Sequence, residues 1–343
     1  MLGIVIVNYN QPGLTLDCLA SLDSSGLTES PRIELVDNSD DDRLVEVISG
    51  WRKTFPFDHL TVLHSGRNLG FASACNLAIE RLLSDQTIER ILLLNNDAVL
   101  LRDGLARLLE YASNHPERDM VAARVHSRAY PNEVDSMGIA MFLSALASNR
   151  QDPSDTCLGP TGGLALFSRR LLEQVRHVHG HVFDADFFCY AEDTDLALRA
   201  LLLGFKPGYL DDCVALHQGQ ASSGGGNSEF VLYHGIRNSI WTLMKDIPAS
   251  LLLILAPVIL AMHVGIIGYH CLSGESRAVF RLYRDAFAGM PRVLRQRRIV
   301  QSQRQIGVLQ LWRYFTARFY QRGYTRAAFK DVWHRLTRRA GGS

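Results

Sequence analysis

Ile91-Leu-Leu-Leu-Asn-Asn-Asp97 is a run of four apolar residues that ends abruptly in two amides and a carboxylate. Such a run predicts a buried strand of a parallel sheet, and the polar residues predict a loop at its carboxyl end. The same order occurs earlier, where Ile4–Val7 precedes Asn8-Tyr9-Asn10 and Ile33–Val36 precedes Asp37-Asn38-Ser39. Strand, polar loop and helix therefore repeat, which predicts an α/β fold with a mostly parallel sheet flanked by helices.

Asp97 is the first candidate for chemistry. Ligands of open α/β sheets bind at the carboxyl ends of the strands, where this side chain is expected to lie. A carboxylate beside a buried strand is costly unless a cation meets it, and a divalent metal that also binds a diphosphate would do so. The alternative is that Asp97 starts a turn or caps a helix, because the residues from Leu101 onward have helical spacing.

A second acidic cluster, Glu192-Asp193-Thr194-Asp195, lies between an aromatic run at 187–190 and a helical pattern at 196–203. The helix dipole favours acidic residues at a helix start, so capping alone explains one or two of them. Capping does not explain why an aromatic run that should be buried leads directly into three carboxylates. A carboxylate in a partly apolar pocket is suited to act as a general base.

Two further segments are candidates for a nucleotide site. His217 ends a strand-like run at 214–216; a lone histidine is usually structural, but neutral imidazole also binds Mn²⁺ and similar metals. The segment 66–76 has glycines before a helix, and its Arg67 can meet a phosphate. Neither a Walker P-loop motif nor a GxGxxG motif after the first strand is present, which disfavours a P-loop nucleotidase and a dinucleotide dehydrogenase.

Charge is distributed unevenly along the 343 residues, although the formal net charge is only +1. Residues 271–343 contain 16 Lys and Arg but 3 Asp and Glu, whereas residues 1–270 contain 20 and 32. The basic tail also carries aromatic residues, which suits an anionic inner membrane surface; self-association into a homo-oligomer is the alternative. The tail has no recognised nucleic-acid reader motif, so no nucleic acid is expected as a partner.

An uncharged segment, Ala249–Leu272, precedes this tail and is long enough to cross a bilayer. A single crossing would separate the tail from the rest of the chain, so a re-entrant or interfacial helix fits better, with a buried hydrophobic hairpin as the alternative. The six cysteines form no CxxC pair and lie in apolar segments, as expected of reduced thiols in a cytosolic chain. The predicted location is the cytoplasmic face of an inner membrane, peripheral or partly embedded.

Taken in order, several segments resemble family 2 glycosyltransferases of the GT-A fold, specifically the rhamnosyltransferase-like branch. The resemblance covers about residues 3–245, and the predicted division is a GT-A domain at 1–245, a hydrophobic segment at 246–273 and a basic amphipathic helical tail at 274–343. The segments that carry it are Val5–Asn10, Val36–Ser39, Arg67–Phe71, Leu93–Asp97, Thr161–Gly163, Phe187–Leu196, His217 and Tyr233–Asn238.

The resemblance implies a site for a nucleoside-diphosphate sugar. Asn8 and Asp37 would line the nucleoside pocket, and Arg67 and Asn68 would hold the nucleotide, with Asn96 among the binding residues. The expected donors are dTDP- or UDP-sugars, with dTDP-rhamnose the first candidate.

The same resemblance implies a metal site. Asp97 would be the last carboxylate of the family's DxD element and would bind Mg²⁺ or Mn²⁺ together with His217. Many relatives have Asp-x-Asp where this chain has Asn95-Asn96-Asp97, so one carboxylate is missing. The donor diphosphate is therefore expected to supply most of the remaining ligands, and metal affinity without the donor should be weak.

The expected reaction is inverting transfer of the sugar to a glycan or lipid-linked glycan in bacterial surface polysaccharide synthesis. Asp193 would be the base, with Glu192 beside it orienting the acceptor, and Gly162 and Gly163 would shape the pocket between donor and acceptor. The alternative is a sugar-nucleotide-binding assembly subunit without transfer activity, which would not need the base.

Overall fold

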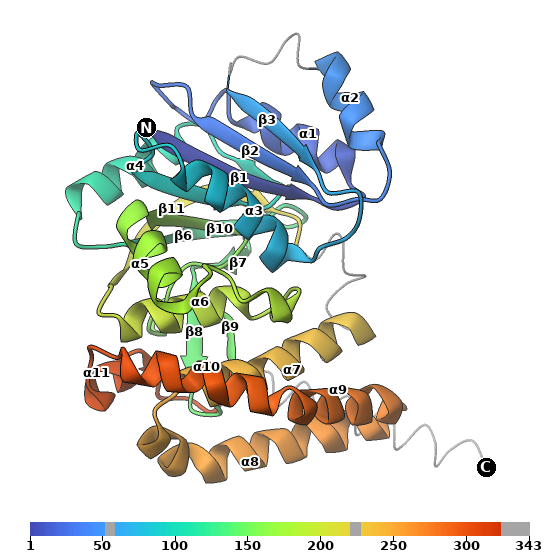
Figure 1. Ribbon diagram of the computed structural model, residues 1–343, viewed down its shortest axis with the longest axis vertical. Coiled ribbons are helices and arrows are strands. Elements are labelled where there is room, and N and C mark those ends of the chain that lie inside the picture. The colour runs from blue at the N-terminus through green and yellow to red at the C-terminus, as the bar shows by residue number, and fades with distance from the viewer. Residues whose placement is uncertain (52–58, 220–227, 324–343) are drawn as a thin grey trace.

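The chain folds around one twisted sheet, and the computed structural model describes residues 1–51, 59–219 and 228–323 (Figure 1). Strands and helices alternate through the first hundred residues, as the sequence predicts. The first four strands pair in parallel in the order β3-β2-β1-β4. These elements are β1 (Leu2–Asn8), α1 (Pro12–Ser21), β2 (Arg32–Asp37), α2 (Arg43–Trp51), β3 (Leu60–His64), α3 (Phe71–Leu83) and β4 (Arg90–Leu94).

The second part of the chain extends this sheet and makes it mixed. Strand β10 lies antiparallel between β4 and β6, and the order continues through β11 to β5, with β7 beside β6. The elements are β5 (Ala98–Leu100), α4 (Gly104–Asn114), β6 (Met120–Ser127), β7 (Val134–Ser136), β10 (Leu164–Ser168), α5 (Arg169–His179), the 3-10 turn η1 (Ala185–Phe187), α6 (Glu192–Leu202) and β11 (Pro207–His217).

The apolar run of β1 shows why the sheet is buried on both faces. Ile4 and Ile6 pack into one core cluster with Leu19 of α1, whereas Val5 and Val7 pack into a second cluster with the residues of α3. A strand covered by helices on both sides therefore needs apolar residues at every position rather than at alternate ones. Each such side chain contributes about 1.5–3 kcal/mol by its burial.

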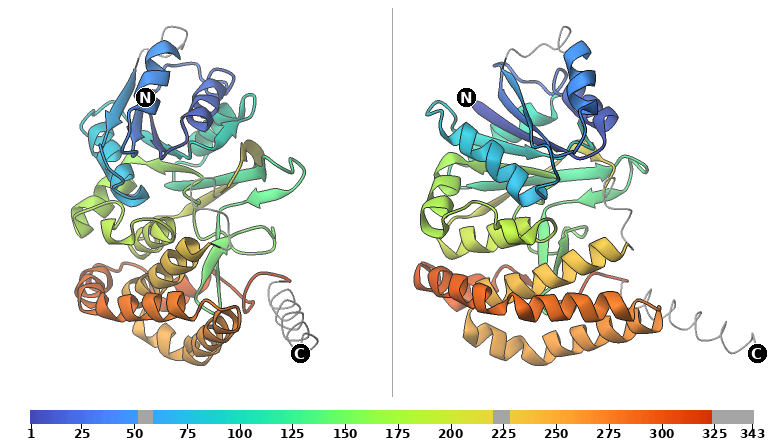
Figure 2. Two further views of the ribbon diagram at one scale, coloured as in Figure 1. Left: turned by 90° about the vertical axis from the view of Figure 1, so that its right-hand side faces the viewer. Right: turned by 45° about the vertical axis from the view of Figure 1, so that its right-hand side comes forward.

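The C-terminal third builds a helical layer at one end of the molecule, where α8, α9 and α10 lie together in both views of Figure 2. This layer belongs to the same folded body, because β12 pairs with β8 of a small second sheet and α7 packs against α6, α9 and α10. Residues 324–343 of the predicted basic tail lie outside the described residues. The elements are β8 (Ile139–Phe142), β9 (Ala147–Asn149), α7 (Glu229–Asp246), α8 (Ala249–Leu272), α9 (Ser276–Ala288), α10 (Met290–Ser302), α11 (Val308–Trp312) and β12 (Phe315–Thr316).

Helix α8 exposes apolar side chains along most of its length. Leu253 is 76% exposed and Leu260 is 66% exposed, while four other residues form the buried stripe that packs toward the protein. By length and composition, α8 is the one helix among the described residues that could cross a membrane. The alternative of a buried hydrophobic hairpin is wrong, because 249–272 forms one continuous helix at the surface.

Candidate active site

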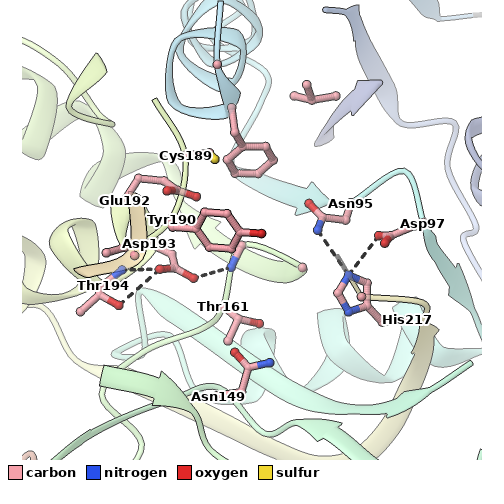
Figure 3. A pocket seen from close by; sticks show the side chains of 18 of the residues that line it. Asn95, Asp97, Asn149, Thr161, Cys189, Tyr190, Glu192, Asp193, Thr194 and His217 are labelled. Atoms are coloured by element: carbon pink, nitrogen blue, oxygen red, sulfur yellow. Dashed lines mark hydrogen bonds and ion pairs between the residues drawn. The ribbon is translucent and has the colours of Figure 1, made fainter. Parts of the chain in front are cut away.

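A cavity of about 640 Å³ opens where β1, β2 and β4 end, as the parallel arrangement predicts. This volume lies within the range of sites for small organic ligands. Loops after these strands, the start of α6 and the end of β11 form its wall (Figure 3). Residues that line it include Tyr9, Asn38, Asn68, Phe71, Asn95, Asn96, Asp97, Thr161, Gly162, Gly163, Tyr190, Glu192, Asp193 and His217.

Asp97 and His217 lie side by side in this cavity, although 120 positions separate them in the sequence. Strand β5 follows Asp97 directly and pairs antiparallel with β11, which places His217 opposite Ala98. The His217 Nε2 atom is 3.0 Å from Asp97 Oδ1, and its Nδ1 atom is 2.9 Å from Asp135 Oδ2. The predicted pair is therefore brought together. Asp97 lies in a tight turn, in which the Ala98 N–H donates to the Asn95 carbonyl at 3.0 Å, and it precedes a strand rather than capping a helix.

The histidine between these two carboxylates has an unusual protonation equilibrium. Burial by itself lowers the pKa of His217, but the hydrogen bonds and charges of Asp135 and Asp97 outweigh burial and raise it to about 10. Without a metal, the imidazole therefore carries a positive charge, which offsets one of the two carboxylate charges and leaves the group with a net negative charge. A divalent metal would take the place of the proton on Nε2, while Asp135 would keep the Nδ1 proton and fix the ring orientation.

The residues present fit a divalent cation in part. Asp97 Oδ1 is buried, and it faces Nε2 of His217 at 3.0 Å. Two adjacent ligands of an octahedral cation, each at about 2.1 Å, lie about 3.0 Å from one another. No group of three metal-ligating side chains occurs within 1–51, 59–219 and 228–323. The protein can therefore supply two ligands, and a bound diphosphate would have to supply more.

Asp193 lies across the cavity from this pair, on the first turn of α6 (Figure 3). Its Oδ2 accepts a hydrogen bond from the Gly162 main-chain N–H at 2.9 Å, and its Oδ1 accepts one from Thr194 N–H at 2.7 Å. Burial raises the pKa of Asp193, and these hydrogen bonds oppose that increase. Burial and the charge of Asp193 also raise the pKa of Glu192, whose Oε2 has no hydrogen-bond partner among the described residues. The pair can therefore exchange a proton with a ligand in the cavity.

The third acid of the cluster has a structural role. Asp195 is fully buried and pairs with Arg199 at 2.7 Å and with Lys245 of α7 at 2.5 Å. Lys245 also pairs with Asp184 at 2.9 Å. Burial raises the pKa of Asp195, but the charges of Arg199 and Lys245 reverse this effect and lower it below the ordinary value. This network fixes α6, and with it Asp193, against α7.

The predicted nucleoside residues lie one layer behind the cavity wall. Asp37 is fully buried and Asn8 is 1% exposed; the Asn8 side chain donates a 2.9 Å hydrogen bond to Asp37. Asn38 and Asn68 line the cavity instead, joined by a 3.0 Å hydrogen bond between their side chains. Arg67 is exposed and does not line the cavity. The binding roles of Asn8, Asp37 and Arg67 stay predictions.

Most of the other predicted residues meet in the cavity. Asn96 lines it, and its side chain donates to Thr15 of α1 at 3.1 Å. Gly162 and Gly163 follow one another between the two acidic groups, and a Cβ at Gly163 would lie 3.5 Å from the imidazole of the metal-site histidine. Sequence reasoning missed Asp135, because the irregular stretch around it carries no motif. Tyr190 was part of a quoted motif but was assigned no role.

The comparisons with known proteins agree with this architecture. The sequence model described as "Glycosyl transferase family 2" matches residues 3–176. No protein with a curated function matches the chain in sequence.

Three solved structures share the fold at low sequence identity. A mannosyltransferase, PcManGT from Pyrobaculum calidifontis, in complex with GDP-Man and Mn²⁺, is 17% identical, with a TM-score of 0.55 over 91% of this chain and 87% of that chain. S. aureus TarS 1–349 is 17% identical, with a TM-score of 0.52 over 88% and 90%. GalNAc-T7 with UDP, GalNAc and Mn²⁺ is 14% identical, with a TM-score of 0.54 over 71% and 48%. The chain spans 40% and 64% of two further TarS chains.

Proposed function

The chain belongs to glycosyl transferase family 2, and we propose that it moves a sugar from a nucleoside-diphosphate sugar to an acceptor hydroxyl with inversion at the anomeric carbon. One observation carries this proposal. A carboxylate with a raised pKa, Asp193, faces a carboxylate–histidine pair, Asp97 and His217, across one cavity (Figure 3). A base on one side and a centre that can hold a cation for the leaving diphosphate on the other are what an in-line displacement requires.

Asp193 would accept the proton of the acceptor hydroxyl, and the hydroxyl oxygen would attack the anomeric carbon as the bond to the diphosphate breaks. The N–H groups of Gly162 and Thr194 hold the Asp193 carboxylate in one orientation for this transfer. A divalent cation held by Asp97 and His217 would supply positive charge that stabilises the leaving diphosphate. Because the protein supplies only two ligands, we expect cation and donor to bind together.

A donor panel tests the proposal directly. The protein is incubated with dTDP-rhamnose, UDP-sugars and GDP-mannose in the presence of Mn²⁺ or Mg²⁺, and release of the nucleoside diphosphate is measured. Among the structural neighbours, PcManGT was solved with GDP-Man and GalNAc-T7 with UDP, which justifies the breadth of the panel. Product stereochemistry by NMR then tests inversion. Nucleotide binding without turnover for every donor would instead support a non-catalytic binding subunit.

Two substitutions assign the roles within the site. A general base contributes about 10²- to 10⁴-fold in rate, so Asp193→Asn should lower kcat by that factor while nucleotide binding persists. Asp97→Ala should weaken binding of donor and Mn²⁺ together. Near-normal transfer by Asp193→Asn, with Asp97→Ala inactive, would show that another group is the base.

We also propose that the acceptor is a glycan, free or lipid-linked, at the cytoplasmic face of an inner membrane. The supporting observation is the exposed apolar face of α8, including Leu253 and Leu260. Helix α8 packs against α9, which carries three arginines and leads into the arginine-rich α10. A helix that is apolar on its exposed side and bordered by basic residues suits an interfacial position on an anionic bilayer. Extraction by high salt, compared with extraction by detergent, separates peripheral from embedded attachment.

A further inference from the structure

The loop that enters α6 has an unusual backbone. Phe188, Tyr190 and Ala191 have φ angles of 65°, 69° and 63°, so three of four consecutive residues occupy the left-handed region. Residues with a Cβ seldom adopt this region, and bulky ones least often. Such conformations persist only where the surroundings impose them, and they gather at ligand sites.

Two neighbouring elements impose this conformation. Asn238 of α7 is fully buried, and its side-chain amide nitrogen lies 2.8 Å from the main-chain oxygens of Phe187, Cys189 and Tyr190, which share its two N–H groups. From the other side, Gly70 lies so close that a Cβ there would be 2.5 Å from the ring of Phe188. The loop is thus held between α7 and the start of α3.

The imposed conformation places Tyr190 in the cavity. Figure 3 shows its ring beside Asp193, pointing toward the side that holds Asn95 and Asp97. The Tyr190 ring meets the ring of Phe230 from α7 edge to face, with 6.3 Å between centroids, and Phe230 is 38% exposed. Both side chains line the cavity on the side of α7.

The two lining rings, Tyr190 and Phe230, are uncharged near neutral pH, and the nearest cation behind them is the buried Arg237, 3.2 Å from His234 Nδ1. His234 packs against the Phe230 ring with 4.5 Å between centroids, and burial lowers the pKa of His234 to about 4. An uncharged aromatic surface beside a carboxylate suits a ligand with a C–H face and a hydroxyl rim, which describes a pyranose ring. Asn38 and Asn68 line the part of the cavity formed by the first strands, so they and the aromatic wall come from different elements.

We infer that Tyr190 and Phe230 form an acceptor-sugar subsite, in which a pyranose ring packs against the aromatic side chains and presents one hydroxyl to Asp193. Asn238 is the positioning residue of this subsite, because it holds the backbone that presents Tyr190. The inference rests on the proposed function, since it names where the acceptor of that reaction binds.

Saturation-transfer NMR on the full chain with UDP or dTDP and Mn²⁺ tests the subsite. The probes are the methyl glycosides of glucose, galactose and rhamnose. An aromatic contact is worth about 2- to 12-fold in affinity, so Phe230→Leu should lower transfer to the ring protons by that factor, whereas Phe230→Trp should retain it. Phe319→Leu is the matched control, because Phe319 is also 38% exposed and does not line the cavity.

The outcomes are separable. Loss in Phe230→Leu, with retention in Phe230→Trp and Phe319→Leu, supports the subsite. No saturation transfer from the wild-type protein to any glycoside, or equal transfer in the two leucine variants, overturns it. Calorimetric titration of UDP, dTDP and GDP into the same samples distinguishes failure of the proposed function from failure of the subsite. If the wild-type protein binds none of the three nucleotides, the proposed function fails. Normal nucleotide binding without an aromatic effect removes only the subsite.

Discussion

Asn238→Asp perturbs the loop before α6 while leaving the size of the side chain unchanged. The substitution keeps the oxygen that accepts a 3.0 Å hydrogen bond from Arg237 Nε, but it removes the amide that donates to three loop carbonyls at 2.8 Å. The amide has two N–H groups, which the three carbonyls share, so at about 1 kcal/mol net for each N–H they stabilise the loop by roughly 2 kcal/mol. The three left-handed residues cost about 1–3 kcal/mol each, so the loop is expected to relax once the amide is gone.

Losing about 2 kcal/mol of stabilisation of the ordered loop corresponds to roughly a 30-fold lower population of the competent state. We therefore expect kcat to fall by about that factor. Affinity for UDP or dTDP should change less than about twofold, because Asn38 and Asn68 belong to other elements. The assays are turnover with the best donor of the panel, calorimetric nucleotide titration, and hydrogen exchange of the amides at 187–191.

Ser168→Ala is the control for a general loss of stability. Ser168 caps α5, where its hydroxyl accepts a hydrogen bond from the Leu171 N–H, and its removal should cost about 0.5–2 kcal/mol without affecting kcat. Asn238→Ala should behave like Asn238→Asp. Wild-type kcat in Asn238→Asp, with unchanged exchange at 187–191, would refute the idea that these hydrogen bonds hold the loop in its active form.

Four further perturbations test other parts of the molecule. Burial raises the pKa of Asp193, and only the ionised form above that pKa can act as a base. We therefore expect kcat/KM to fall as the pH drops through a value above the ordinary ~3.9 of an aspartate. An acid limb near 4 in the pH–rate profile would contradict this. Lys245→Met removes the ammonium partner of two buried carboxylates. It should lower the free energy of unfolding by about 3–5 kcal/mol in a denaturant titration. A change below about 1 kcal/mol would show that this ion pairing does not stabilise the fold. Asp135→Asn should weaken Mn²⁺ binding in the presence of UDP by about 10- to 100-fold in a calorimetric titration, since this carboxylate orients the metal-site histidine; equal affinities would exclude that role. Replacing both Leu253 and Leu260 by Ser should reduce sedimentation of the protein with anionic vesicles. The melting temperature should stay unchanged, because both side chains are exposed. Unchanged sedimentation would argue against α8 as the membrane contact.

Local sequence patterns were sufficient to predict the fold of the first hundred residues. Short apolar runs followed by polar loops predicted the parallel strands and the cavity at their ends, because burial between two helical layers imposes that composition on each strand directly. Asp97, Asp193 and His217 were identified for the same reason, since each ends or begins an element at the cavity. The helix predicted from Leu101 begins at Gly104, after the short strand β5, because three residues carry too little periodicity to separate strand from helix.

In the C-terminal part, tertiary packing decided more than the sequence pattern did. The sequence predicted the apolar length of 249–272, but which of its side chains pack on the protein and which remain exposed depends on α9. The acidic cluster at 192–195 divides in the same way. Burial against Arg199 and Lys245 makes Asp195 a structural anchor, whereas Asp193 faces the cavity.

By itself, then, the sequence determined the α/β architecture, the end of the sheet where ligands bind and the residue types available there, since these follow from periodicity and from the chemistry of single segments. Only the tertiary structure decided which of these residues meet. Pairing of β11 with β5 brings His217 to Asp97, and pairing of β7 with β6 accompanies the approach of Asp135. Hydrogen bonds from α7, about 50 positions later in the sequence, set the conformation that presents Tyr190. Contacts over such distances depend on how strands and helices pack, which no local pattern encodes.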